Sequence, residues 1–134
     1  MEDDPISLCS ELSRNLATLR GRFCAGSNAD VILRRFRSGA FDSALLTIDG
    51  MTDTREIDEN ILKPCMALPP EAGEDAPPEG RVDYLMEHVV SVLPTEMKSN
   101  FDDLIADALS GQSVLLCDGC AVACVMDTRG FEKR

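Results

Sequence analysis

The most informative pattern of hydrophobic and polar positions lies in residues 44–66, ALLTIDGMTDTREIDENILKPCM. A short apolar run predicts a buried strand that stops at Asp49-Gly50, because glycine adopts positive φ at little cost. Asp53 then precedes Glu56 by three residues, the spacing of a helix-capping box. Behind this cap, apolar residues recur at helical spacing: Ile57, Ile61, Leu62 and Cys65. The stretch predicts a strand that leads directly into a capped amphipathic helix.

Two further elements are predicted before this unit. Residues 5–23 have leucines at helical spacing, with Asp4 as N-cap and Pro5 in the first turn, and predict an amphipathic helix. Consecutive apolar residues predict a strand over 30–36. A loop of roughly six residues that includes Ser38-Gly39 would join it to the strand at residue 44 as a β-hairpin.

The C-terminal half is predicted to contain two more helices. Apolar residues recur at helical spacing in residues 81–90 and again after the N-cap Ser99-Asn100. Gly111 stands where the second of these helices should end. Residues 89–93 are rich in β-branched side chains, which favours a strand that ends before Pro94.

Asp118-Gly119 is the strongest signal for a hairpin turn, between strands over 114–117 and 121–126. Such a turn predicts that Cys117 lies opposite Cys120 and that Ser113 lies opposite Cys124. Both faces of this hairpin are apolar, so helices should cover it on both sides. Together the elements predict an α/β fold, with a small mixed sheet of about four or five strands layered with amphipathic helices.

We expect residues 1–134 to form a single α/β domain, because this length suffices for one hydrophobic core. Residues 68–80, LPPEAGEDAPPEG, are acidic and rich in proline, and they predict a solvated, disordered loop with nothing to bury. The last residues, DTRGFEKR, have the pattern of a turn that continues, which predicts a domain truncated before a further segment.

The net charge of −11 argues against nucleic acid as a partner, because binding to phosphates requires clustered basic residues. Arg34, Arg35 and Arg37 form the one basic cluster, which we interpret as a solvated face of a strand. No apolar run approaches the ~18 residues of a membrane span. The acidic N-terminus predicts no export signal, so the six cysteines are expected in a reducing compartment.

Cys117, Cys120 and Cys124 form the one pattern with metal-binding or redox spacing. A metal site needs about four converging ligands, and the other cysteines are scattered singly along the chain. A thioredoxin-like role is less favoured, because the pair lies in a hairpin rather than at a helix N-terminus. We therefore interpret these three as core cysteines and predict neither a metal nor a cofactor.

The remaining chemistry offers no catalytic constellation. His88 is the sole histidine and has no spaced serine or cysteine motif, and no glycine-rich phosphate loop occurs. Asp49 and Asp118 could form an acid pair or include a phospho-acceptor, but Asp-Gly is also ordinary turn chemistry, which we favour at both places. The residues thus predict sensing or interaction rather than enzymatic activity.

The order of motifs resembles the N-terminal soluble region of the A subunits of GerA-type spore germination receptors. The segments that carry this resemblance are Asp30-Val31-Ile32, Ile48-Asp49-Gly50, Asn60-Ile61-Leu62-Lys63-Pro64, Val114-Leu115-Leu116 and Thr128-Arg129-Gly130-Phe131. Cys65 and Cys117 stand where this family usually has larger aliphatic residues, which leaves the subfamily open.

The resemblance implies a non-catalytic domain in endospore germination that transmits a signal or stabilises subunit assembly. It implies B and C receptor subunits as partners, a homo-oligomer as a further option, and a nutrient germinant. It also implies a second subdomain and a membrane region downstream, with this domain on the cytoplasmic (core) side of the spore inner membrane. The family supplies no catalytic residue to carry over.

Two alternatives stay open at this point. The first is a small-ligand sensor with a pocket at the strand ends near Asp49 and Asp118, where open α/β sheets bind ligands. The second is the redox or metal protein built on the three clustered cysteines. The candidate ligand or interface residues are Asp49, Gly50, Asp118, Gly119, Arg129 and Gly130.

Overall fold

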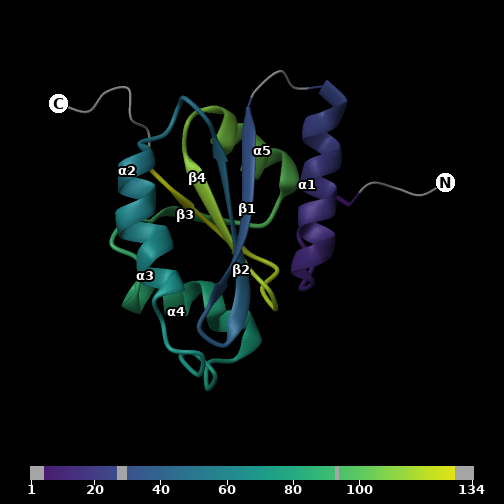
Figure 1. The fold of residues 1–134 in the computed structure, drawn as a ribbon. Helices are drawn as coiled ribbons and strands as arrows, with labels where there is room; N and C mark the ends of the chain where they lie inside the picture. The colour runs from purple at the N-terminus through teal and green to yellow at the C-terminus, as the bar shows by residue number, and fades with distance from the viewer. Residues whose placement is uncertain (1–4, 27–29, 93, 129–134) are drawn as a thin grey trace.

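The computed structural model describes residues 5–26, 30–92 and 94–128, and these form one five-stranded sheet with helices on both faces (Figure 1). The strands lie in the order β1-β2-β4-β5-β3. Their bounds are β1 (Val31–Ser38), β2 (Phe41–Ile48), β3 (Pro94–Lys98), β4 (Ser113–Cys117) and β5 (Ala123–Met126). The predicted fold class and size of the sheet are confirmed, but each strand pair is antiparallel, so the sheet is not mixed in direction.

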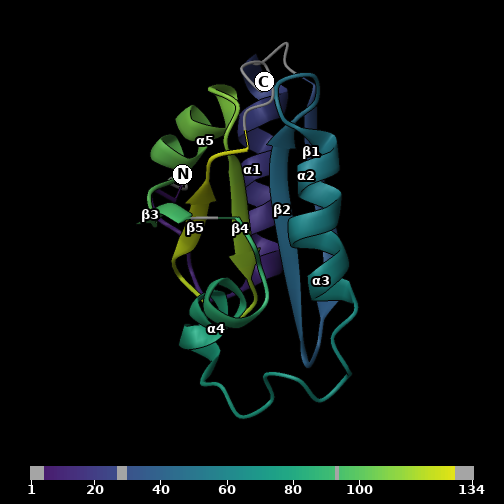
Figure 2. The ribbon, with the colours of Figure 1, turned by 90° about the vertical axis from the view of Figure 1, so that its left-hand side faces the viewer.

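The helices divide between the two faces of the sheet (Figure 2). Their bounds are α1 (Leu12–Gly26), α2 (Thr54–Ile57), the π-helix η1 (Asp58–Leu62), α3 (Lys63–Met66), the 3₁₀ turn η2 (Pro78–Gly80), α4 (Arg81–His88) and α5 (Phe101–Leu109). One hydrophobic core lies between the sheet and α1 and α5, and a second lies beneath α2, η1, α3 and α4. Coverage of the β4–β5 hairpin on both sides is therefore confirmed. None of the helices in the described ranges is long and apolar enough to cross a membrane.

Helix α1 begins at Leu12, so the predicted start at Pro5 is wrong. The residues before it are not helical, because their backbone bonds to a distant segment instead of continuing a helix. The N–H of Leu8 donates to the carbonyl of Ser99 (2.8 Å), and the N–H of Phe101 donates to the carbonyl of Ile6 (2.9 Å). The predicted N-cap Asp4 lies outside the described residues.

The β1–β2 hairpin is confirmed, but its turn is shorter than predicted. Ser38 pairs with Phe41, so only Gly39 and Ala40 form the turn, and Gly39 has a φ of 61°. The expected strand before Pro94 is wrong, because β3 begins at Pro94 itself. β3 lies at the edge of the sheet, where the first position of a strand tolerates proline.

The predicted register of the β4–β5 hairpin is wrong by two residues. Ser113 pairs with Met126, and Cys124 pairs with Leu115 instead of Ser113. The N–H of Cys120 closes a turn onto the carbonyl of Cys117 (3.2 Å), but the ladder resumes only at β5. A shift of two residues keeps every side chain on its original face, so the predicted division of these strands between the two cores holds.

The helix predicted after Asp53 is present as the continuous run α2–η1–α3. The Asp53 carboxylate accepts the N–H of Glu56 (3.2 Å), which confirms the predicted cap. Pro64 has no N–H to donate to the carbonyl four residues before it, that of Asn60. This carbonyl instead accepts the N–H of Ser91 (3.0 Å), which ties the helix to the segment after α4.

Residues 68–80 form a loop, but the expectation that it has nothing to bury is wrong. The carbonyl of Ala72 accepts the N–H of Ala40 (2.9 Å) from the β1–β2 turn. A Cβ built on Gly73 would lie 2.8 Å from the ring of Phe41, so the loop backbone packs directly on that ring. Leu68 packs, partly buried, against the second core, and the segment then runs through successive turns into η2.

Candidate functional site

Asp49 and Asp118 lie at opposite ends of the sheet. Asp49 follows the last residue of β2, whereas the N–H of Asp118 donates to the carbonyl of Asp42 near the start of β2 (2.9 Å). Because β2 and β4 are antiparallel, their C-terminal ends point in opposite directions. The structure therefore does not bring the two aspartates together in one pocket.

The Asp118-Gly119 turn is hydrogen-bonded to the beginning of α1. The carboxylate of Asp118 accepts the backbone N–H of Leu12 (3.0 Å), and the N–H of Gly119 donates to the carbonyl of Ser10 (2.8 Å). An N-terminal helical N–H has no partner within its own helix, and negative charge there also suits the helix dipole. Asp118 thus acts as a cap for a helix that is distant in sequence.

Arg81 also contacts this turn, from the side of the sheet that bears the second core. Its Nη1 donates to the backbone carbonyl of Asp118 (2.8 Å), and its guanidinium lies 5.0 Å from the centre of the Phe41 ring. Gly119 has a φ of 98°, and a Cβ there would lie 2.8 Å from Cβ of Pro78. Glycine at this position serves both the turn and the contact with the loop.

Asp49 lines a cleft of about 140 Å³ between β1–β2 and the α2–η1 helix. Leu45, Ile57 and Leu62 contribute apolar lining, and Arg34 and Asp58 line it together with Asp49. These three charged side chains form no ion pair with any residue that the structure describes. The next residue, Gly50, has a φ of 89° and open space around it, as expected for a strand exit.

The other two arginines of β1 differ from Arg34, because both are paired. Arg35 and Arg37 contact the carboxylate of Asp42 at 3.1 Å and 3.2 Å. Desolvation acts to raise the pKa of Asp42, but the hydrogen bonds from Arg37 and Arg35 lower it overall. The basic cluster therefore separates into two arginines that share one carboxylate and one, Arg34, that faces the cleft.

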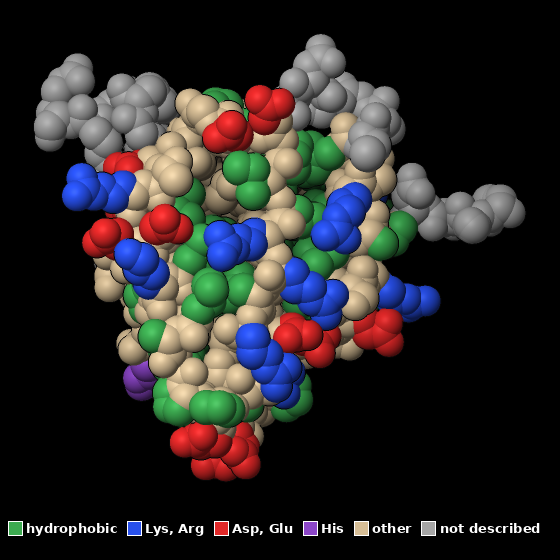
Figure 3. Space-filling view, in the orientation of Figure 1, with side chains coloured by type: hydrophobic (Ala, Val, Ile, Leu, Met, Phe, Trp, Pro, Cys, Tyr) green, Lys and Arg blue, Asp and Glu red, His purple; other side chains and the backbone are tan. Residues whose placement is uncertain are grey.

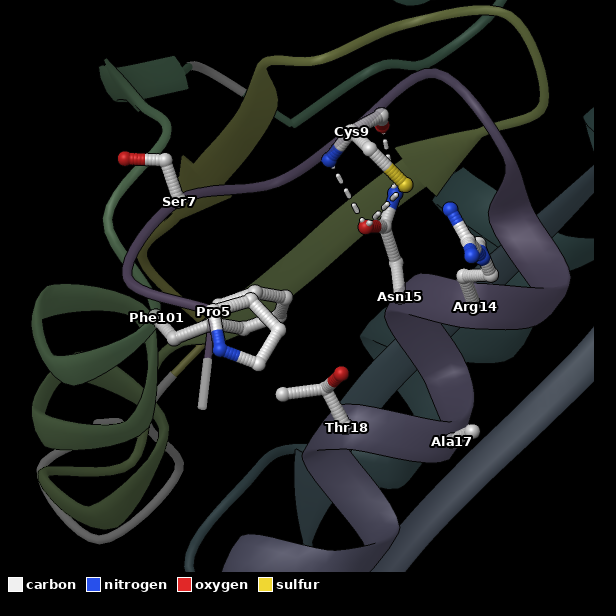
Figure 4. A pocket seen from close by; sticks show the side chains of 8 residues that line it. All are labelled: Pro5, Ser7, Cys9, Arg14, Asn15, Ala17, Thr18 and Phe101. Atoms are coloured by element: carbon white, nitrogen blue, oxygen red, sulfur yellow. Dashed lines mark hydrogen bonds between the residues drawn. The ribbon is translucent and has the colours of Figure 1, made fainter. Parts of the chain in front are cut away.

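A cavity of about 390 Å³ lies between the N-terminal segment and α1 (Figure 4). Asn15 is only 2% exposed, and its side-chain amide accepts the N–H of Cys9 (2.9 Å) and donates to the carbonyl of Cys9 (2.8 Å). The sequence does not predict this cavity, because the leucine spacing indicates a helix that includes residues 5–11. The available signal was Asn15 itself, a polar residue beside the leucine stripe of α1.

The clustered cysteines are buried thiols. Cys117 contacts the hydroxyl of Ser43 (3.4 Å), and Cys120 donates to the carbonyl of Pro78 (3.1 Å). Burial raises the pKa of Cys117 and Cys120, and it raises the pKa of Cys124 to about 11, so all three favour the protonated form at neutral pH. Among the side chains that the structure describes, no three Cys, His, Asp or Glu converge on a point that could hold a metal ion.

Arg129 and Gly130 lie outside the described residues. The residue before them, Thr128, is fully buried and is hydrogen-bonded at the Asp49 end of the sheet. Its carbonyl accepts the N–H of Asp53 (2.8 Å), and its hydroxyl bonds to that of Ser113.

Comparison with known proteins places this fold among spore germination proteins. Residues 18–134 match the family described as "Bacillus/Clostridium GerA spore germination protein". The chain is 23% identical over 136 aligned positions to spore germination protein KA of Bacillus subtilis (strain 168), which covers 99% of this chain but 24% of that protein. It superposes with a TM-score of 0.73 and 24% identity on the N-terminal domain of the A subunit of the Bacillus megaterium spore germinant receptor GerK3, covering 94% of this chain and 49% of that one.

Proposed function

Since the chain belongs to the GerA spore germination family, we propose that it is the first part of the N-terminal domain of a germinant receptor A subunit and acts in endospore germination without catalysis. The observation that carries this proposal is the fold match, because nearly the whole chain superposes on about half of an A-subunit N-terminal domain. Its role in this proposal is signal transmission or subunit assembly.

The geometry favours an interaction domain over an enzyme. Asp118, the carboxylate nearest to the clustered cysteines in sequence, caps a helix, and the cysteines themselves are buried thiols. Both faces of the sheet are covered by helices and apolar cores. The side chains that sequence analysis singled out at the Asp118 turn therefore support the fold, which leaves the surface as the part available to partners.

In this proposal the domain works with B and C receptor subunits, and self-association is a further option. A downstream region would anchor the protein in the spore inner membrane, with this domain on the core side. The stimulus would be a nutrient germinant. The chain spans 24% of the length of the curated relative, so the residues that bind the nutrient need not lie in this part.

Deletion of the gene in the spore-forming organism that carries it tests the proposal. Spores would be given a panel of amino acids and sugars, and germination followed as loss of optical density. We expect the response to at least one nutrient to disappear and to return with a reintroduced wild-type copy, while spore yield and heat resistance stay unchanged. A full response to every nutrient that triggers wild-type spores would contradict the proposal.

A second candidate function, a small-ligand sensor, is favoured by the cleft beside Asp49. The cleft combines apolar lining with Arg34 and Asp49, which form no ion pair with any described residue, and this suits a small polar ligand. Thermal unfolding with millimolar amino acids, sugars or cations tests this function. A stabilising ligand should lose its effect in Asp49→Asn but not in Asp75→Asn, which changes an exposed loop carboxylate; no shift with any compound excludes the sensor.

A further inference from the structure

β1 is an eight-residue edge strand whose outer side has no partner among the described residues. The two-residue turn makes Ser38 and Phe41 a hydrogen-bonded pair, and the N–H of Asp49 donates to the carbonyl of Asp30 (2.8 Å) in the same phase. Hydrogen-bonded pairs therefore fall at even-numbered positions of β1. The backbone groups that point away from β2 belong to Val31, Leu33, Arg35 and Arg37.

Accessible apolar side chains accompany this free edge. Ile32 is 43% exposed and lines the cleft under the α2–η1 helix, and Met66 at the end of α3 is 48% exposed. Nη2 of Arg34 lies 4.0 Å from Sδ of Met66, which connects β1 with α3. A free strand edge beside a cleft is the arrangement in which an added strand gains main-chain hydrogen bonds and places alternate side chains in pockets.

The charge at this edge indicates which kind of strand can bind there. Arg34, Arg35 and Arg37 lie on β1 of a chain with a net charge of −11, and Figure 3 shows Lys and Arg side chains running down the face over β1. Antiparallel pairing of two β1 strands across a two-fold axis at Arg34 would set Arg34 of one copy directly against Arg34 of the other, which is unfavourable. A strand with acidic side chains would instead supply carboxylates to Arg34 and to the Arg35–Arg37 pair.

We propose that the outer edge of β1 binds an extended, acidic segment of a partner receptor subunit by strand addition. This inference rests on the proposed role in receptor assembly and names the surface through which assembly occurs. The added strand bonds to the backbone of Val31, Leu33, Arg35 and Arg37 and places a carboxylate against Arg34. An aliphatic side chain two positions along the added strand, on the same face as that carboxylate, enters the cleft beside Ile32.

A synthetic peptide tests the surface directly. The capped peptide Glu-Thr-Val-Thr-Glu-Thr, which presents glutamate and valine on one face, and its counterpart with lysine for glutamate would be added at millimolar concentration, and amide hydrogen exchange followed by NMR. We expect the acidic peptide to slow exchange at Val31, Leu33, Arg35 and Arg37, and the lysine peptide to have no effect. Equal effects of the two peptides, no slowing at these amides, or concentration-dependent slowing without peptide would overturn the proposal, the last indicating a second copy at the edge.

Charge reversal supplies the matched comparison. Arg34→Glu should abolish the slowing by the acidic peptide, whereas Arg20→Glu, an exposed change on α1, should preserve it. Arg34→Gln, which adds no negative charge, should weaken the slowing by the acidic peptide. It replaces Arg34→Glu in this experiment if that variant does not fold. In spores, a normal nutrient response with Arg34→Glu, where gene deletion abolishes the response, would overturn strand addition and leave the proposed function intact.

Discussion

The carboxylate of Asp118 accepts the backbone N–H of Leu12 across 3.0 Å, although the two residues are 106 positions apart in sequence. This bond joins the β4–β5 turn to the first turn of α1. It explains why the helix begins at Leu12, and it gives a structural role to an aspartate that sequence analysis considered for ligand binding.

Replacement of Asp118 tests this role. Asp118→Ala should lower the free energy of unfolding by about 1 kcal/mol, as loss of a helix cap does. Asp118→Asn keeps an acceptor oxygen and should recover part of that loss. Urea unfolding of both variants gives the comparison, with Asp75→Ala in the exposed loop as the control. A loss no larger than that of the control would mean that the bond to Leu12 contributes nothing.

Alanine substitutions at Gly119 and Gly50 distinguish the stability cost of backbone strain from that of steric contact. Both have positive φ, 98° and 89°, but a Cβ at Gly119 would meet Pro78 at 2.8 Å, whereas Gly50 has open space. We expect Gly50→Ala to cost about 1 kcal/mol for the left-handed conformation, and Gly119→Ala to cost clearly more. Thermal or urea unfolding measures both. Equal losses would show that the loop moves away from the turn without a penalty.

Gly21 offers a stabilising change. It lies within α1, is exposed, and has no atom within 4 Å of the position that a Cβ would occupy. Gly21→Ala should raise the free energy of unfolding by about 0.8 kcal/mol, because alanine loses less backbone entropy in a helix. The reverse change at exposed Ala17 of the same helix, Ala17→Gly, should lower it by a similar amount. An unchanged stability in Gly21→Ala would indicate that α1 is not helical at this position.

The buried thiols predict a stability that falls in alkaline solution. Burial raises the pKa of Cys65 to about 12 and that of Cys124 to about 11, against 9.0 for a free thiol. The unfolded chain therefore loses these protons first, so this contribution is complete below pH 9, declines above it, and is lost as the pH rises through the folded values. Urea unfolding at several pH values between about 8 and 10.5 measures the slope.

The matched variants for this slope are Cys124→Ala and Val114→Ala. Both remove buried atoms, but only the first removes a titrating group. Cys124→Ala should flatten the decline of stability with pH, whereas Val114→Ala should lower stability at every pH and keep the wild-type slope. An identical slope in the two variants would show that the Cys124 thiol ionises as readily in the folded protein as in the unfolded chain.

Local signals predicted most of the elements but not their partners. The caps at Asp53 and Asn100 were predicted correctly because the bonds that define them join residues two or three positions apart. The β4–β5 register was predicted incorrectly, because Asp118-Gly119 closes a turn whereas the ladder resumes only at Leu115 and Cys124. A pocket near Asp49 was expected, but its charged lining was not predicted, because Arg34 and Asp58 reach the cleft from different elements.

The sequence by itself determined which residues are apolar on each face, where turns and caps fall, and the family to which the chain is similar. These features depend on side-chain period and on neighbours within one turn. Only the tertiary structure decided that Asp49 and Asp118 lie at opposite ends of the sheet, that Asp118 caps α1, and that β1 is an edge strand of the described sheet. Such relations depend on strand order and direction, which arise from backbone bonds between residues far apart in the chain.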